Sequence, residues 1–254
     1  MRKSVSVFFL FLLTVGLLAN SQVDNIFKEA LNDFESRDYQ NALNKFRSIE
    51  HEGIINANLF YNIGNCYFRL NEIGRSILYF RKALKVKSNH EPARRNLEFV
   101  LTFTKDKQDS GSEDVIRSFW KRLFDSFSIN LLAVITIIIF SLIILLICLT
   151  ILFYREREKT VPLFITTILI FFLFIFLILS LLKWRDYHIE NEGVLLALSA
   201  IGYSGPSNDF TRVFTIHEGM TFEIERQEND WCLIKLPIGL GGWIKIETFE
   251  RIKL

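Results

Sequence analysis

The sequence predicts a multidomain protein of mixed class, with an α-helical array, two transmembrane helices and a small β-barrel. Three observations predict it: helical spacing of apolar residues before position 105, two long uncharged runs in the middle, and alternating periodicity after position 190. Half of the 254 residues are hydrophobic and 23% are charged. Because these two groups are separated along the chain, the composition indicates membrane spans joined to soluble parts.

Residues 1–21 have the order of a signal peptide. Arg2 and Lys3 precede an apolar run over 5–19, and Ala19 and Ser21 are small residues just before Gln22. We expect cleavage before Gln22, and the alternative is an uncleaved anchor helix. In both cases the residues that follow would be exported into the periplasm.

Residues 22–104 contain a repeat with a period of 34 residues. A shift of 34 aligns Tyr39 with Ile73, Ala42 with Ser76, Phe46 with Phe80, and Asn62 with Asn96. The better copy, 57–90, carries a pattern that resembles the tetratricopeptide repeat: Phe60, Ile63, Gly64 and Tyr67, then Ile73, Ser76, Phe80 and Ala83. Gly64 and Ser76 are small where the two antiparallel helices of a pair must approach closely. Such helix pairs stack into an α-solenoid. We expect two repeats and a covering helix that starts at Pro92.

The first copy departs from the pattern at its turn. Its spacing from Phe34 to Tyr39 is one residue shorter than the spacing from Tyr67 to Ile73. We therefore expect a less regular first repeat.

The resemblance implies a concave groove lined by the first helix of each repeat. Asn62 and Asn96 are one repeat apart and should face this groove, and Asn65 lies on nearly the same face. An amide donates and accepts hydrogen bonds, so it can hold a peptide backbone whatever the ligand's side chains are. Tyr61 and Arg95 are weaker candidates. Alternatively, Asn62 bonds within the array and Asn65 is merely solvated.

The middle of the chain predicts attachment to a membrane. Residues 105–128 read as a polar linker followed by an amphipathic helix, lying in the membrane interface or packed against the array. The apolar runs at 130–154 and 161–184 are each long enough to cross a bilayer. The signal peptide would place the turn at 155–160 in the cytoplasm and the tail outside again.

Residues 190–254 predict about five short strands and a small barrel. Four motifs resemble a bacterial SH3-like domain: Gly205-Pro206-Ser207, His217-Glu218-Gly219-Met220, Asp230-Trp231 and Gly242-Trp243. We expect Trp231 and Trp243 to fill the core. The alternative is an aromatic ligand surface, because some such domains bind cell-wall peptides.

Few residues form a pattern that predicts catalysis or metal binding. The four histidines are isolated, and the three cysteines fall in different segments. We find no metal-ligand spacing and no nucleophile–base motif, and we expect neither a cofactor nor an enzymatic activity. The net charge of +2 gives no indication of nucleic-acid binding.

The whole chain resembles the aerotolerance-operon E-type proteins (BatE) of Gram-negative bacteria. The resemblance rests on the order of the segments and on the stretch YNIGNCYFRLNEIGRSILYFRKAL. It implies a scaffold of the inner membrane that works beside von Willebrand A-type membrane proteins and a MoxR-type ATPase in stress tolerance. We therefore expect a non-enzymatic adaptor that binds protein partners through the groove. The alternative is an envelope sensor that binds peptidoglycan through the SH3-like tail.

Overall fold

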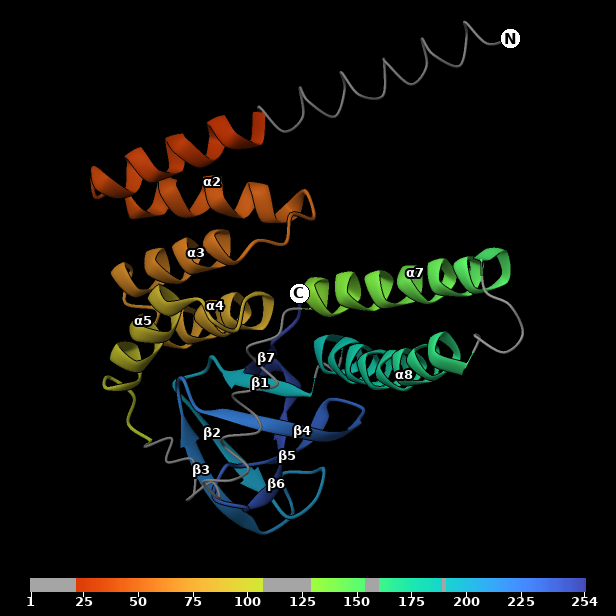
Figure 1. Cartoon of the computed structure of the whole chain (residues 1–254). Coiled ribbons are helices and arrows are strands. Elements are labelled where there is room, and N and C mark those ends of the chain that lie inside the picture. Colours follow the sequence, from red (N-terminus) through yellow and green to blue (C-terminus); the bar gives the residue numbers. More distant parts are fainter. Residues whose placement is uncertain (1–21, 107–128, 154–159, 189–190) are drawn as a thin grey trace, which may run out of the picture. The chain divides into compact units, whose positions relative to one another are not determined.

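The computed structural model describes residues 22–106, 129–153, 160–188 and 191–254. These residues contain seven α-helices and an antiparallel sheet of seven strands (Figure 1). They belong to two compact units, one formed by the array and the sheet and the other by two long apolar helices. The predicted signal peptide, the membrane-adjacent helix and most of the predicted cytoplasmic turn lie outside the described residues.

The array is a series of short helices that stack in succession (Figure 1). A first helix, described over 22–35, is followed by α2 (Tyr39–His51), α3 (Ala57–Arg69), α4 (Ile73–Val86) and α5 (Glu91–Leu101). Pro92 stands in the first turn of α5, where its missing N–H is not needed. The helices α3 and α4 lie within residues 57–90, and α5 begins at Glu91, one residue before Pro92.

The backbone repeats after 34 residues as the sequence does. Arg37 and Asn71, which are 34 apart, both adopt left-handed conformations, with φ of 67° and 64°. The same turn hydrogen bonds recur around them, such as Asp38 N–H to Asp33 O and Glu72 N–H to Tyr67 O, both 2.9 Å. The expectation of a less regular first repeat was wrong at this turn, because α2 and α4 begin at Tyr39 and Ile73, in the same register of the repeat.

The two helices of the second pair approach closely at Gly64. A Cβ atom at this position would lie 2.8 Å from the ring of Phe80, which is closer than carbon atoms pack. Beside it, the buried hydroxyl of Ser76 donates a 2.9 Å hydrogen bond to the Gly64 carbonyl. The prediction that small residues stand at this crossing is confirmed.

The sheet has the strand order β3-β2-β6-β5-β4-β1-β7. Its strands are β1 (Glu192–Leu195), β2 (Ser199–Tyr203), β3 (Arg212–His217), β4 (Thr221–Glu228), β5 (Trp231–Lys235), β6 (Gly241–Lys245) and β7 (Phe249–Arg251). The expected count of about five was too low. The two strands that were not predicted are β2, which contains small residues, and β7, which has three residues.

The sheet packs against the array through α4, β1 and β7. Val194 and Ile252 are buried in the same apolar cluster as the helices, and α4 contacts β1 directly. The β-domain is therefore part of one unit with the array rather than a separate module.

The second unit consists of α7 (Ile129–Phe153) and α8 (Thr160–His188), which pack side by side. Within the described residues, the stretches 131–152 and 160–185 are long and apolar enough to cross a membrane. Most of their large apolar side chains are exposed in the monomer. That exposure is expected of helices that contact lipid and unexpected of buried core helices.

Candidate functional site

A groove of about 280 Å³ opens between α3 and α5. Its polar lining comes from Tyr61, Asn65 and Arg69 on α3 and from Asn96 on α5, and its apolar lining is Phe34, Phe68, Phe80, Phe99 and Val100. Of the predicted site residues, the groove thus brings together Tyr61, Asn65 and Asn96. An aromatic wall with a few polar groups is the usual make-up of a recognition site.

The two groove amides are bonded to each other. The Nδ2 atom of Asn96 donates to the Oδ1 atom of Asn65 at 2.7 Å and lies 3.4 Å from the hydroxyl of Tyr61. This bond fixes both amide planes and uses one donor and one acceptor. Among the described residues, Asn65 Nδ2 and Asn96 Oδ1 have no hydrogen-bond partner, so the pair still offers one amide donor group and one acceptor to a ligand.

Asn62 and Arg95 do not line the groove. Asn62 is half-buried one helical turn before Asn65, and Arg95 is exposed, 3.9 Å from Glu91 on its own helix. Positions 34 apart therefore do not face each other across the groove. The contacting pair, Asn65 and Asn96, is 31 apart, so Asn96 meets α3 one helical turn beyond Asn62, the residue equivalent to it in the repeat.

Three phenylalanines at one end of the groove were not predicted as site residues. The rings of Phe68, Phe99 and Phe103 meet edge to face, with centroids 5.2 to 5.7 Å apart. Phe99 and Phe103 are 55% and 56% exposed. The only available signal was their aromatic character at positions outside the repeat pattern. An exposed aromatic cluster beside a groove is typical of a protein-binding surface.

His90 holds one end of the groove in place. It is the N-cap of α5, where its Nδ1 atom accepts the Ala93 N–H at 3.1 Å and its Nε2 atom lies 2.9 Å from Asn58 Oδ1. Because Nδ1 is an acceptor, the proton of the neutral ring is on Nε2, which donates to Asn58. Burial lowers the pKa of His90, and the charge of Lys87 lowers it further. The Tyr61 ring packs on His90 at a centroid distance of 5.4 Å.

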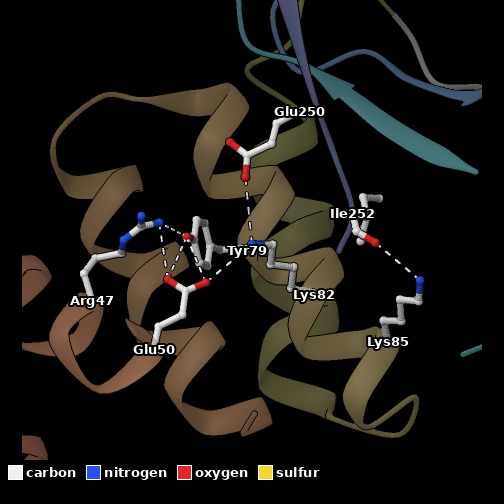
Figure 2. A network of polar contacts seen from close by, with 7 residues as sticks. All are labelled: Arg47, Glu50, Tyr79, Lys82, Lys85, Glu250 and Ile252. Carbon is white, nitrogen blue, oxygen red and sulfur yellow. Dashed lines mark hydrogen bonds and ion pairs between the residues drawn. The ribbon is translucent and has the colours of Figure 1, made fainter. Parts of the chain in front are cut away.

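A polar network links the array to the sheet (Figure 2). Lys82 of α4 lies 3.4 Å from Glu50 of α2 and 3.9 Å from Glu250 of β7, and only 8% of its side chain is exposed. The hydroxyl of Tyr79 donates to Glu50 at 2.9 Å and accepts a hydrogen bond from Arg47. Two cations therefore compensate the Glu50 carboxylate, so the network ties three elements together rather than forming a reactive site.

The two tryptophans proposed for the sheet differ in exposure. Trp243 is buried, 5% exposed, with the guanidinium of Arg226 over its ring at 5.1 Å. Trp231 is half-buried and its ring meets Tyr203 edge to face at 5.6 Å. Each contact reaches across one intervening strand, β5 in the first case and β6 in the second. The packing agrees with a core role for Trp243 and leaves only part of Trp231 on the surface.

The described residues contain no cluster of three or more histidine, cysteine or acidic side chains that could hold a metal ion. Burial raises the pKa of the Cys66 thiol to about 12, so this cysteine is a neutral core residue. The groove remains the feature with the geometry of a binding site. No protein-family model matches the chain, and no curated protein matches it in sequence.

Proposed function

We propose that the protein is a non-enzymatic scaffold of a bacterial inner membrane that binds a segment of a partner protein in the groove between α3 and α5. The observation that carries the proposal is the Asn65–Asn96 amide pair beside an exposed aromatic cluster. The amides can hydrogen-bond a ligand backbone, while the phenylalanine rings can bury one or two apolar side chains.

The packing of the array supports a tetratricopeptide assignment. The period of 34 residues recurs in the helix starts, in the left-handed turn residues and in the turn hydrogen bonds. The short antiparallel strands of the tail are compatible with an SH3-like domain. Together with α7 and α8, they support membership in the BatE-type proteins, and hence von Willebrand A-type membrane proteins and a MoxR-type ATPase as partners in stress tolerance.

Chain connectivity supports a particular topology. The array and the sheet form one unit although α7 and α8 separate them in the sequence. If the two helices cross the membrane, an even number of crossings returns the chain to the side from which it left. The predicted signal peptide would make that side the periplasm.

The alternative, a sensor that reads the cell wall through the sheet, has less support. It needs exposed aromatic rings, whereas Trp243 is buried and Trp231 packs on Tyr203. The cluster of Phe68, Phe99 and Phe103 lies on the array instead.

Copurification from native membranes in mild detergent tests the proposal. The variant Asn65→Ala/Asn96→Ala should lose a discrete set of membrane partners that the wild type retains. Asn62→Ala is the matched control, because it makes the same change one helical turn away and outside the groove lining. Retention of the same partners by the double variant would contradict the groove as a recognition site.

A further inference from the structure

The turn between β3 and β4 sits against two elements of the array. It consists of His217, Glu218 and Gly219, and each of these residues contacts a segment more than a hundred positions earlier in the chain. The two segments are the start of α4 and the residues after α5. We call these three residues the wedge.

Glu218 occupies the N-terminus of α4. Its Oε1 atom accepts the backbone N–H of Gly74 at 2.8 Å. The residue in the N-cap position, Glu72, makes no capping hydrogen bond of its own with its side chain. The first turn of α4 therefore obtains its carboxylate from the sheet, where it satisfies a helix N–H and complements the helix dipole.

His217 binds the segment that follows α5. Its backbone N–H donates to Asp106 Oδ2 at 2.6 Å, and its Nδ1 atom lies 3.0 Å from Asp106 Oδ1. Lys105 Nζ lies 3.0 Å from the Nε2 atom. An ammonium group only donates, so Nε2 is the acceptor and Nδ1 carries the proton that Asp106 receives.

Gly219 lies between these two contacts, where there is no space for a side chain. A Cβ atom there would lie 2.7 Å from Ile77 Cδ1 on α4 and 2.7 Å from Thr104 Cγ2 after α5. Its φ is +85°, a conformation that glycine adopts without strain. The absence of a side chain thus lets the wedge fit between the two segments.

We propose that the wedge is the positioning element of the groove. One of the two segments is the start of α4, which lines the groove through Phe80, and the other directly follows α5, which lines it through Asn96, Phe99 and Val100. A change in the spacing of α4 and α5 moves Phe80 relative to Asn96 and Phe99. The β-domain thereby sets the shape of the groove without contacting the ligand. The effect of the wedge on partner binding rests on the proposed function, whereas its effect on the positions of α4 and α5 does not.

Gly219→Ala tests the wedge, and Gly239→Ala is its matched control. Gly239 has a φ of +86°, but a Cβ atom there meets nothing within 4 Å. Both variants therefore carry the same backbone strain, and only Gly219→Ala disturbs α4 and the segment after α5. A second pair, Glu218→Ala and Glu218→Gln, separates loss of the acceptor from loss of the charge, because glutamine retains the Oε1 acceptor.

The readout is amide hydrogen exchange by mass spectrometry on the full chain in detergent. Gly219→Ala and Glu218→Ala should speed exchange about tenfold in the first turn of α4 and the last turn of α5, while α2 keeps its wild-type rate. Gly239→Ala and Glu218→Gln should stay near wild type. Equal exchange in the two glycine variants, or faster exchange spread evenly over α2 as well, would overturn the proposal.

Partner retention separates this proposal from the proposed function. Gly219→Ala should lose the partners that Gly239→Ala keeps. If Asn65→Ala/Asn96→Ala loses partners but Gly219→Ala does not, the wedge does not set the groove and the inference fails. If no variant loses partners, the proposed function fails. The hydrogen-exchange rates then decide whether the wedge positions α4 and α5.

Discussion

The side-chain amide of Asn96 donates a 2.7 Å hydrogen bond to the amide oxygen of Asn65 on the neighbouring helix α3. This bond joins two residues that are 31 positions apart and that both line the groove. Because each amide fixes the other, their remaining donor and acceptor are held in place before a ligand arrives. Such preorganisation reduces the entropy that is lost on binding.

Lys82 should be important for the stability of the unit formed by the array and the sheet. Lys82→Ala removes a buried cation from between Glu50 and Glu250, and we expect the free energy of unfolding to fall by about 2–4 kcal/mol. Lys82→Met keeps most of the side-chain volume, so its free energy of unfolding should fall less than that of Lys82→Ala. Denaturation of the full chain in detergent, followed by circular dichroism, measures this. Lys87→Ala, which changes an exposed lysine of the same region, should stay within about 0.5 kcal/mol. Equal losses for Lys82→Ala and Lys87→Ala would contradict the network in Figure 2.

His90 should make stability depend on pH. Its pKa is lowered in the folded protein, chiefly by burial, so the unfolded chain takes up a proton at a higher pH than the folded one. The contribution of the neutral ring is fully present above the ordinary histidine pKa of about 6.5 and is lost as the pH falls below it. His90→Asn keeps a capping acceptor but cannot titrate. The free energy of unfolding, measured between pH 8 and pH 5, should therefore decrease less with falling pH in the variant than in the wild type. The same pH dependence in both proteins would exclude His90 as the cause.

The array and the sheet should be accessible from the same side of the membrane. With Cys148 replaced by alanine, Asn89→Cys and Asn208→Cys place thiols at exposed positions in the array and in the sheet. A thiol reagent that cannot cross membranes should label both from the periplasm, whereas Glu158→Cys in the predicted cytoplasmic turn should react only after permeabilisation. Labelling of one domain and not the other would contradict the two-span topology.

Much of the fold could be predicted because its signals are local. The spacing of Gly64, Ser76 and Phe80 predicted a close helix crossing, and Pro92 predicted the start of α5; both are confirmed. The strands β2 and β7 were missed because one contains small residues and the other is short, and tertiary contacts rather than propensity stabilise them.

The groove could be predicted only in part. The 34-residue period placed Asn62 and Asn96 in one groove, whereas Asn96 bonds to Asn65, one helical turn further along α3. Phe68, Phe99 and Phe103 form a cluster only after α3 and α5 pack. The contacts of Glu218 with Gly74 span 144 positions and leave no periodic signal in the sequence.

Site-specific photocrosslinking in living cells can show whether a partner protein binds at the groove. A photoreactive phenylalanine analogue at position 99 replaces one aromatic ring by another at the exposed end of the groove. The control is the same analogue at Arg94, an exposed residue on the opposite side of α5. A partner bound in the groove should give a discrete crosslinked product from position 99 and none from position 94. No crosslink at position 99, or the same products from both positions, would contradict the groove as a protein-binding site.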